Sequence, residues 1–322
     1  MTWLVTGGAG YIGAHVVAAM RAAGEPVVAF DDLSTGDPAR LGDVPLVKGT
    51  VLDGGLVRQT LAEHAVTGVV HLAAKKQVGE SVQRPLWYYR ENVEGLRVLL
   101  EAVTDAGVSS VLFSSSAAVY GSPDVDVVRE DTPCAPVNPY GGTKLVGEWM
   151  LADVAAATGL RYAALRYFNV AGAAAPQLAD RGVFNLVPMV FRELDQRRSP
   201  VIFGADYGTP DGTCIRDFIH VSDIASAHVA AARALAGGEV DTLIANIGRG
   251  EGVSVREMVS MIREVTGTAD EPWAEPVVAD RRPGDPARVV AAADRIAERL
   301  GWRARYDLRE MVESAWAGWR SA

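Results

Sequence analysis

The order of apolar and amphipathic segments predicts an α/β fold with a doubly wound parallel sheet and a smaller C-terminal α/β region. In the first half, short runs that are apolar throughout alternate with longer stretches of helical periodicity. Such strands are buried on both faces, and the helices between them supply right-handed crossovers. A glycine-rich turn between the first apolar run and the first helical stretch favours the same fold.

The segments follow one another in the order that this sheet requires. Apolar runs predict strands at 3–5, 26–30, 44–47, 68–72, 110–113 and 161–165. Helical periodicity predicts helices at 12–23, 55–64, 87–106 and 140–158. After about residue 166 the alternation is less regular, and the segments 171–181, 204–217 and 280–286 are expected to be loops. Loops of this kind often carry binding groups.

Composition and charge exclude several classes of protein. The chain has 322 residues, of which 49% are hydrophobic and 22% are charged, as is typical of globular proteins. Its net charge of −9 argues against a nucleic-acid partner, because phosphate backbones are bound by clustered Lys and Arg. Cys134 and Cys214 belong to no Cys-x-x-Cys pattern, so we expect two reduced thiols and no metal site.

The sequence also predicts no association with a membrane. No segment approaches 18 uninterrupted apolar residues, the length of a membrane-spanning helix. The N-terminal residues lead directly into the glycine-rich turn, without the basic and apolar regions of a signal peptide. We therefore expect a soluble, cytoplasmic protein.

The glycine-rich turn predicts a dinucleotide site on a Rossmann sheet. Gly7, Gly10 and Gly13 follow the first strand and open the first helix. Glycine permits the tight turn, and it lets the backbone and the helix N-terminus approach a pyrophosphate. Asp31 and Asp32 end the second strand, where a carboxylate accepts hydrogen bonds from the adenosine ribose. A carboxylate there repels a 2′-phosphate, so the sequence favours NAD over NADP.

A serine, a tyrosine and a lysine form the candidate catalytic set. Ser116 ends a run of three serines after a strand, and Tyr140 and Lys144 lie four residues apart at the start of a helix. That spacing places both side chains on one helical face. An ammonium group beside a phenol lowers the phenol pKa, which would make Tyr140 a general base near neutral pH. Lys144 can also hold the cofactor ribose, and Ser116 can orient a substrate hydroxyl.

Together these features resemble the extended short-chain dehydrogenase/reductase family, and within it the UDP-glucose 4-epimerases (UDP-galactose 4-epimerases). The matching runs extend over nearly the whole chain. They are 78–81 (VGES), 114–121 (SSSAAVYG), 166–169 (RYFN), 202–204 (IFG), 211–213 (DGT), 216–221 (RDFIHV) and 281–285 (RRPGD). Several of these runs are specific to enzymes of nucleotide sugars.

The resemblance implies a tightly bound NAD cofactor and a UDP-sugar substrate. The cofactor-binding residues that it implies are Gly7, Gly10, Tyr11, Ile12, Gly13, Asp31, Asp32, Thr50, Val51, Leu72, Ala73, Ala74, Lys76, Asn92, Ser114, Tyr140, Lys144 and Phe168. The substrate-binding residues that it implies are Ser116, Tyr140, Asn169, Asn185, Leu186, Val201, Phe203, Arg216, Arg282, Asp285 and Val289. The two arginines suit a diphosphate, because guanidinium groups bind phosphate oxygens bidentately.

The function that the resemblance implies is an isomerase of carbohydrate and galactose metabolism. It inverts C4 of a UDP-hexose: Tyr140 removes the proton of the 4-hydroxyl, the hydride passes to NAD, and it returns to the other face of a 4-keto sugar. The expected cofactor-binding domain comprises 1–168 and about 217–247, and the UDP-sugar-binding domain comprises about 169–216 and 248–322. A homodimer packed through helices 92–106 and 140–158 is also expected.

Related activities remain open as alternatives. Dehydratases and decarboxylases of the family carry an acidic residue just before their Val/Ile-Tyr-Gly, where this chain has Ala117 and Ala118. That difference favours simple epimerisation. A UDP-glucuronate 4-epimerase, an oxidoreductase that exchanges its cofactor at each turnover and a non-catalytic sensor of NAD or metabolites are the other interpretations.

Two positions depart from the best-known epimerases. Thr50 stands where an Asp usually contacts the adenine amino group, which puts that contact in doubt. Val289 stands where some members carry a bulky Tyr beside the sugar. The smaller side chain leaves room, so N-acetylated UDP-sugars are expected to fit as well.

Overall fold

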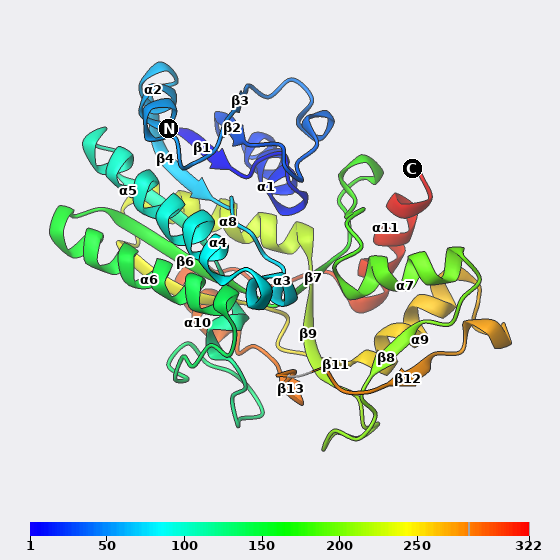
Figure 1. The fold of residues 1–322 in the computed structure, drawn as a ribbon. Coiled ribbons are helices and arrows are strands. Elements are labelled where there is room, and N and C mark those ends of the chain that lie inside the picture. The colour runs from blue at the N-terminus through cyan, green and yellow to red at the C-terminus, as the bar shows by residue number, and fades with distance from the viewer. Residues whose placement is uncertain (283, 322) are drawn as a thin grey trace.

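A parallel sheet with helices on both faces forms the larger lobe of this computed structural model (Figure 1). The structure describes residues 1–282 and 284–321; Pro283, in the run 281–285, lies outside the described residues. Within them the sheet has seven strands in the order β10-β6-β5-β4-β1-β2-β3, and every neighbouring pair is parallel. The strands are β1 (Thr2–Thr6), β2 (Val27–Asp31), β3 (Leu46–Lys48), β4 (Val66–His71), β5 (Ser110–Ser116), β6 (Arg161–Tyr167) and β10 (Thr242–Ile247). The predicted doubly wound fold is confirmed.

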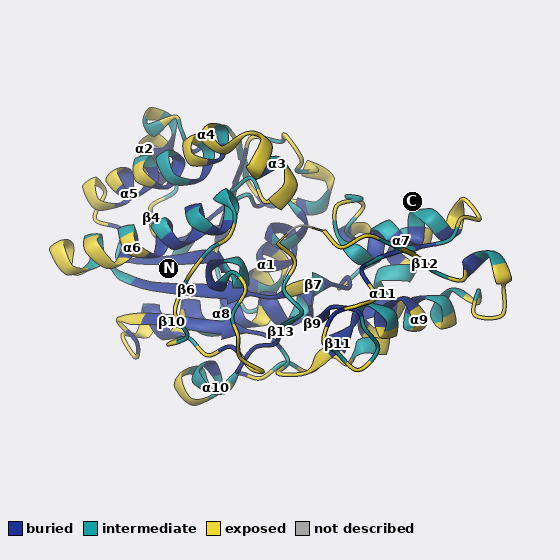
Figure 2. Cartoon of the chain, turned by 60° about the horizontal axis from the view of Figure 1, so that its bottom comes forward, coloured by how far each residue is buried: buried dark blue, intermediate teal, exposed yellow. Residues whose placement is uncertain are grey.

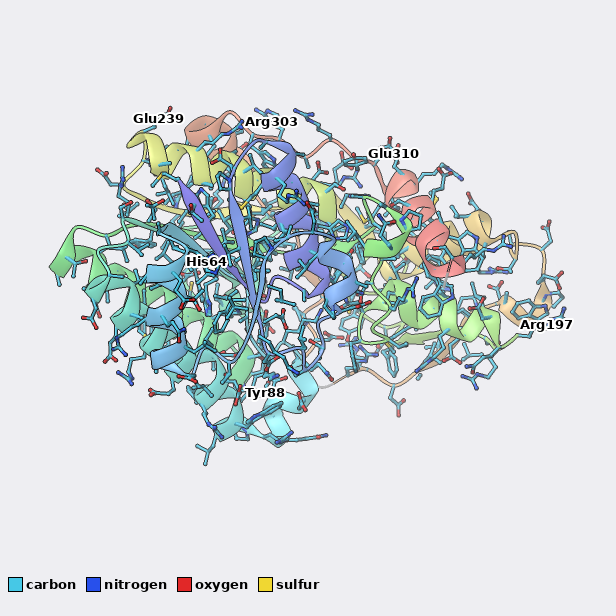
Figure 3. The ribbon with its side chains drawn as sticks, turned by 90° about the horizontal axis from the view of Figure 1, so that it is seen from above. His64, Tyr88, Arg197, Glu239, Arg303 and Glu310 are labelled. Carbon is cyan, nitrogen blue, oxygen red and sulfur yellow. The ribbon has the colours of Figure 1, made fainter. Side chains whose placement is uncertain are left out.

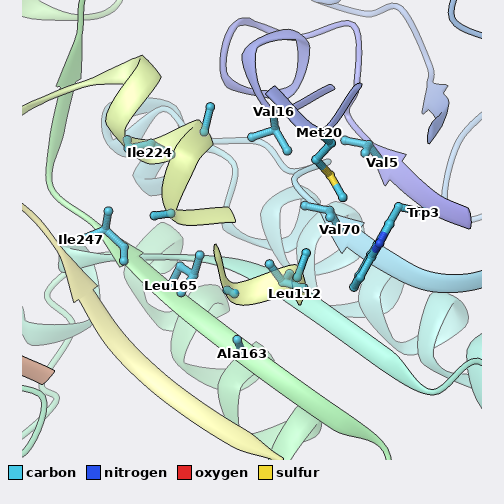
Figure 4. Packing of buried hydrophobic residues seen from close by; sticks show 14 of the residues in the cluster. Trp3, Val5, Val16, Met20, Val70, Leu112, Ala163, Leu165, Ile224 and Ile247 are labelled. Carbon is cyan, nitrogen blue, oxygen red and sulfur yellow. The ribbon is translucent and has the colours of Figure 1, made fainter. Parts of the chain in front are cut away.

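One face of the sheet is covered by α1 (Tyr11–Ala22) and α8 (Val221–Gly237), which pack against each other. Val16 and Met20 of α1 and Ile224 of α8 meet the strand side chains Val5 and Leu165 in one core cluster (Figure 4). The strands carry apolar residues along their whole length because their other face is covered too. In Figure 2 the strands of the sheet are accordingly among the most buried parts of the chain.

The opposite face is covered by α2 (Gly54–Glu63), α5 (Gly95–Asp105) and α6 (Pro139–Thr158). Leu99 of α5 and Leu151 of α6 are fully buried against β4 and β5. Asn138 caps α6 by accepting a hydrogen bond from Gly141 N at 2.9 Å, and Pro139 takes the first helical position. Gly159, with φ +75°, ends the helix. The strands and these helices lie within a few residues of their predicted positions.

One predicted helix is interrupted. The single helix expected at 87–106 is divided into α4 (Pro85–Tyr88), a π-helical segment η2 (Tyr89–Glu94) and α5. Gly95 N donates to Arg90 O, five residues earlier, so one extra residue is inserted in the turn. The apolar spacing of the sequence averages over such an insertion and does not reveal it. π-Helical turns are frequent at functional sites.

The smaller lobe contains short strands and three longer helices. Its strands are β7 (Asn169–Ala171), β8 (Val201–Phe203), β9 (Ile215–His220), β11 (Gly252–Ser254), β12 (Val277–Ala279) and β13 (Arg288–Val289). The helices α7 (Leu186–Asp195), α9 (Val255–Thr266) and α11 (Leu308–Arg320) enclose a separate apolar cluster. Two predicted loops are shorter than expected: β7 extends to Ala171, and β9 begins at Ile215. Arg216 therefore lies on a strand and not in a loop.

Short helices complete the described chain. They are η1 (Pro38–Leu41), α3 (Val78–Gln83), η3 (Ala117–Tyr120), η4 (Pro176–Leu178), η5 (Pro272–Ala274) and α10 (Asp294–Leu300). In the view from above, Arg197, just after α7, lies at the tip of the smaller lobe, far from His64 at the end of α2 (Figure 3). Among the described residues, no helix has the length and apolar character needed to cross a membrane.

Three hydrogen bonds join helices α1 and η1 to the segment after β7. Tyr11 Oη donates to Gly172 O at 2.6 Å, and Ala174 N donates to His15 Nε2 at 3.0 Å. Arg40 Nη2 donates to Ala179 O at 3.0 Å. The glycine-rich turn and the loop that leads into the smaller lobe are thereby held side by side.

Candidate active site

The predicted cofactor residues gather at one edge of the larger sheet. Because all seven strands are parallel, their carboxyl ends share this edge. The glycine-rich turn follows β1, the two aspartates end β2, and residues 72–74 follow β4. The order of the strands reverses between β1 and β4, which is where ligands bind in open α/β sheets.

The glycine-rich turn has the shape of a cradle for a pyrophosphate. Gly7 has φ +69°, and a Cβ there would lie 2.8 Å from Ala73 N. A Cβ at Gly13 would lie 2.0 Å from Gly7 O, so helix and turn pack too closely for any side chain. Gly10 is the N-cap of α1 and offers no side-chain hydrogen bond to the first helical turn. Backbone N–H groups there are suited to an anion.

The two aspartates at the end of β2 have different tasks. Asp31 is 6% exposed, and its carboxylate accepts hydrogen bonds from Ala9 N at 3.0 Å and Leu33 N at 2.8 Å. It therefore braces the glycine-rich turn, and burial raises its pKa. Asp32 is more exposed and accepts from Ser34 N at 2.8 Å. Of the pair, Asp32 is the carboxylate with more room for a ribose.

The loop after β4 carries two adjacent lysines near the predicted cofactor site. Lys76 is exposed, whereas Lys75 Nζ lies 2.9 Å from Ser34 Oγ and 3.8 Å from Asp32 Oδ2. Lys76 stays the predicted cofactor residue, and Lys75 is a second cation that the sequence did not single out. The backbone of Lys75 is held on both sides by Asn92, with Lys75 N to Oδ1 at 2.8 Å and Nδ2 to Lys75 O at 2.9 Å. Asn92 also donates to Thr143 Oγ1 at 3.0 Å, so the π-helical turn ties this loop to α6.

The remaining predicted cofactor residues lie around this edge. Leu72 N donates to Thr6 O at 3.1 Å, and Ala73 N donates to Thr6 Oγ1 at 3.4 Å, which fixes the start of the loop. Ala74 is partly buried beside them. Thr50 and Val51 follow β3, and the Thr50 hydroxyl accepts from Leu52 N at 3.3 Å.

The candidate catalytic residues come from the end of β5 and the start of α6. Lys144 Nζ donates to Ser114 O at 2.7 Å and lies 6.0 Å from the centre of the Tyr140 ring. The Ser116 hydroxyl faces Tyr140 and lowers the pKa of the phenol by hydrogen bonding. Ser116 Oγ also accepts from Ala118 N at 3.2 Å, which fixes the rotamer of its side chain. The sequence therefore identified three residues that the fold brings together.

Burial governs the pKa values of this set. It lowers the pKa of Lys144 to about 7, and the nearby Glu148 carboxylate opposes that shift. It raises the pKa of Tyr140, which the Ser116 hydroxyl only partly offsets. Burial therefore outweighs the groups that favour the phenolate in the protein alone, and the lowering of the phenol pKa by Lys144 stays a prediction. The ammonium lies to one side of the ring and is bonded to the Ser114 carbonyl oxygen.

A buried ion pair that was not predicted joins Glu148 of the catalytic helix α6 to Arg166 of β6. Glu148 accepts hydrogen bonds from Arg166 Nε at 2.9 Å, Arg166 Nη2 at 2.6 Å and Ser115 Oγ at 2.5 Å. Its side chain is 3% exposed and that of Arg166 is 5% exposed. A Glu four residues after Lys144 is the signal in the sequence, but ordinary helices often have a Glu at such a position.

The predicted substrate residues form two pairs and a helix terminus. Arg216 Nη2 lies 3.4 Å from Asp285 Oδ1, and the Arg282 guanidinium stacks 3.9 Å from the centre of the Phe203 ring. Val201 lies two residues before Phe203 on β8 and so faces the same side. Asn169 is exposed at the start of β7, which pairs with β9.

The N-terminus of α7 carries the other two predicted contacts. Asn185 is the N-cap residue, but its amide donates to Asp180 Oδ2 at 2.6 Å and leaves the first turn without a side-chain cap. Leu186 begins the helix and is partly buried. The free N–H groups of this turn are suited to phosphate oxygens.

Phe168 and Val289 meet in one apolar cluster beside the 3₁₀ turn that follows Ser116. Both are buried, at 8% and 7% exposure. Val289 also pairs with Arg216 across β13 and β9. The cluster therefore joins a predicted cofactor residue to two predicted substrate residues.

The described part of the chain offers no evident metal site. No cluster of three or more His, Cys, Asp or Glu side chains is arranged to hold a metal ion there. Cys134 and Cys214 are both free thiols.

Comparisons with known proteins agree with this geometry. Residues 3–248 match the family model described as "NAD dependent epimerase/dehydratase family". The UDP-glucose 4-epimerase of Azospirillum brasilense is 48% identical, over 99% of this chain and 92% of that protein, and the Corynebacterium glutamicum enzyme of the same name is 43% identical, over 98% and 95%. A UDP-glucose 4-epimerase from Stenotrophomonas maltophila, crystallised with NAD and formylated UDP-arabinopyranose, superimposes with a TM-score of 0.94 at 39% identity, over 100% of this chain and 98% of that one. This chain therefore belongs to the NAD dependent epimerase/dehydratase family.

Proposed function

We propose that this protein is an isomerase, an NAD-dependent epimerase that inverts C4 of a UDP-hexose such as UDP-glucose or UDP-galactose. The observation that carries the proposal is the convergence of Ser116, Tyr140 and Lys144 beside the glycine-rich turn. The relatives named above, which match this chain over nearly their whole length, are UDP-glucose 4-epimerases. Ala117 and Ala118 follow Ser116, where an elimination reaction would need an acid.

NAD fits the residues at the carboxyl edge of the sheet. The tight turn, in which Gly7 and Gly13 pack directly against backbone atoms, and the uncapped first turn of α1 suit its pyrophosphate. Asp32 suits the adenosine ribose, and Lys75 is a cation within reach of the same part of the cofactor. When bound, NAD supplies a hydride acceptor for C4 and returns the hydride to the opposite face of the sugar. Because NAD is regenerated in each cycle, it does not have to leave the site, and we expect it to stay tightly bound.

The side chains of the site manage the proton of the sugar 4-hydroxyl. Tyr140 takes that proton, and Ser116 holds the same oxygen in place. The positive nicotinamide ring and the ammonium of Lys144 both favour the phenolate, which offsets the burial that raises the pKa of Tyr140. Return of the proton from Tyr140 completes the reaction on either face of the sugar.

The proposed UDP-sugar site lies between loops of the two lobes. Arg216 and Arg282 supply bidentate donors for the diphosphate, together with the N-terminus of α7. Asp285 keeps Arg216 in position and can accept from a ribose hydroxyl. Asn169, Asn185, Leu186, Val201 and Phe203 supply polar and apolar contacts for the nucleoside and the sugar.

The small side chain of Val289 affects which UDP-sugars the site can accept. Val289 lies next to Arg216 and packs on Phe168, so a bulky residue there would project toward the sugar. We therefore expect N-acetylated UDP-hexoses to be accepted. Comparing kcat/KM for UDP-glucose and UDP-N-acetylglucosamine checks this, and a preference above ~100-fold for the plain sugar contradicts it.

The proposed division into domains follows the two lobes. The cofactor-binding domain comprises 1–168 and about 217–247, and the UDP-sugar-binding domain comprises about 169–216 and 248–322. The separate apolar clusters of the two lobes support this division in outline, but Ile296 and Trp302 pack in the cluster of the larger lobe, so α10 lies with that lobe. A cytoplasmic location is proposed with it.

A homodimer is also proposed, packed through the helices of residues 92–106 and 140–158. Trp149 of α6 is 59% exposed, and Leu86, Val82 and Tyr89 on neighbouring turns are 82%, 62% and 43% exposed. Apolar side chains grouped in this way favour burial against a second copy. The mass in solution, measured by light scattering, tests this proposal.

The experiment that tests the function needs no added cofactor. Purified protein is denatured and assayed for released NAD, and the native protein is incubated with UDP-glucose or UDP-galactose alone. The expected result is about one NAD per chain and approach to the same equilibrium mixture from either side. A protein that needs stoichiometric external NAD and forms NADH would be a net oxidoreductase, and one that leaves both sugars unchanged would contradict the proposal.

A further inference from the structure

Glu148 lies on the same face of α6 as the two catalytic residues. Tyr140, Lys144 and Glu148 are spaced by four residues, so their side chains follow one another along the helix. Glu148 is the member farthest from the carboxyl edge of the sheet. Its carboxylate is nearly inaccessible to solvent, at 3% exposure, and it does not reach the edge where substrate is proposed to bind.

The carboxylate is fixed from two strands. Arg166 on β6 binds it with two nitrogen atoms, at 2.9 and 2.6 Å, and Ser115 on β5 donates at 2.5 Å. Arg166 in turn donates to Tyr120 Oη at 2.8 Å, and Tyr120 donates to Asn246 Oδ1 at 2.7 Å. The network therefore joins α6, three strands of the sheet and the 3₁₀ turn that follows Ser116.

The serine bound by Glu148 stands between two residues of the active site. The carbonyl oxygen of Ser114 accepts the hydrogen bond from Lys144 Nζ at 2.7 Å, and the hydroxyl of Ser116 faces Tyr140. A hydrogen bond to Ser115 thus fixes the backbone from which both neighbours project. Glu148 reaches the catalytic pair along the helix and also through the strand.

From this arrangement we propose that Glu148 is a positioning residue for the Tyr140/Lys144 pair. Its buried carboxylate, fixed by Arg166, keeps the Lys144 amine protonated and holds residues 114–116 against it. The inference deepens the proposed function, because it concerns the proton chemistry of the same site. A buried ion pair gives little net stability over apolar residues of the same shape, so a role in the site accounts better for its retention than stability does.

Among the groups around Lys144, Glu148, which is itself paired with Arg166, is the anion that acts on it. Tyr140 and Glu148 face it from α6, and His71 faces it from β4. Burial and the charge of Lys144 lower the pKa of His71 to about 3, so His71 is neutral at the pH of an assay. Tyr167 on β6, which faces Tyr140, has its pKa raised by burial and is neutral too. Burial lowers the pKa of Lys144 to about 7, and only the Glu148 carboxylate acts against this.

The test compares a variant that loses the charge with variants that keep it. Glu148→Gln is nearly isosteric and removes the charge, whereas Glu148→Asp keeps it. Because Glu148→Gln leaves Arg166 without its partner and is expected to reduce stability, the double variant Glu148→Gln/Arg166→Met removes both charges. Glu264→Gln is the matched control, since Glu264 forms a half-exposed ion pair with Arg309 at 2.7 Å, away from the site.

Lys144 can be observed directly because the chain has only four lysines, Lys48, Lys75, Lys76 and Lys144. The NAD-loaded protein is labelled with ¹³C-lysine, and the Cε signals are followed by NMR from pH 5 to 10. Lys144→Met identifies the signal of Lys144. The alkaline limb of the pH profile of kcat is measured on the same samples.

Loss of the Glu148 charge is expected to move the Lys144 titration midpoint down by about one pH unit, with the alkaline limb of kcat moving in the same direction. Glu148→Gln shows this shift, Glu148→Asp and Glu264→Gln keep the parent midpoint, and the double variant, which also loses the Arg166 cation, shifts less than Glu148→Gln. A midpoint in the folded Glu148→Gln variant that coincides with that of the parent overturns the proposal, even if kcat is lower. If the midpoint shifts but no protein, the parent included, interconverts the UDP-hexoses, the proposed function fails while the role of Glu148 stands.

Discussion

At the scale of single residues, the proposed chemistry depends on the phenol of Tyr140, which lies beside Ser116 at the carboxyl edge of the sheet. Tyr140→Phe removes only the hydroxyl that takes the proton of the sugar. Turnover is expected to fall by about 10²–10⁴-fold, the usual contribution of a general base, with binding of NAD and UDP nearly unchanged. Stopped assays give kcat, and calorimetry with UDP reports on binding. Near-normal turnover would sink the assignment of Tyr140, and loss of UDP binding would show that the change is not confined to the hydroxyl.

Single residues also show how much of the candidate site could be predicted from the sequence alone. Ser116, Tyr140 and Lys144 could be found because a strand end and a helix start have defined spacing. The contacts of Lys75 with Ser34 and Asp32 could not be predicted, because the direction of a loop side chain depends on what holds the backbone, here Asn92. The pKa of Tyr140 was also out of reach, since spacing on a helix says nothing of how deeply the ring is buried.

At the scale of elements, the turn between β1 and α1 tests the cofactor site. A Cβ at Gly13 would lie 2.0 Å from Gly7 O, so Gly13→Ala must displace the turn or the helix. We expect a loss of about 1–3 kcal/mol in the free energy of unfolding and protein purified largely without NAD. Gly79→Ala is the control, because a Cβ there meets nothing within 4 Å. NAD content and urea unfolding measure both effects, and wild-type NAD content in Gly13→Ala would contradict the close packing.

Elements in the first half of the chain could be predicted well because each apolar run is a buried strand. The π-helical turn could not, since one inserted residue hardly changes the apolar pattern of 87–106. The short strands of the smaller lobe were also missed. Strands of two or three residues, such as β13, have too few side chains to show an alternation.

At the scale of the whole molecule, four buried histidines make the fold sensitive to acid. Burial lowers the pKa of His15, His220 and His228 to about 4 and that of His71 to about 3. A histidine that binds protons more tightly when unfolded stabilises the fold fully above pH ~6.5, and this contribution is lost as the pH falls toward about 4. Asp217 acts in the opposite direction, because burial raises its pKa to about 6.

The free energy of unfolding is therefore expected to fall between pH 7 and pH 5 by about 1–2 kcal/mol for each of these histidines, less the smaller gain from Asp217. Urea unfolding followed by tryptophan fluorescence at pH 7, 6 and 5 measures the change. Stability that is constant or rises over this range would contradict the burial of the histidines in the neutral form.

The placement of α8 has a consequence for synthesis of the chain. Strands β1 to β6 are complete by Tyr167, but the face of the sheet that α1 shares with α8 lacks its second helix until residues 221–237 have been made, and β10 closes the edge later still. A growing chain thus exposes Leu112, Leu165 and their apolar neighbours while the ribosome adds some seventy further residues, from Tyr167 to Gly237. Exposed apolar faces of this kind invite aggregation and engage chaperones. Expression of this protein should depend more on the speed of elongation and on chaperone supply than its compact final form suggests.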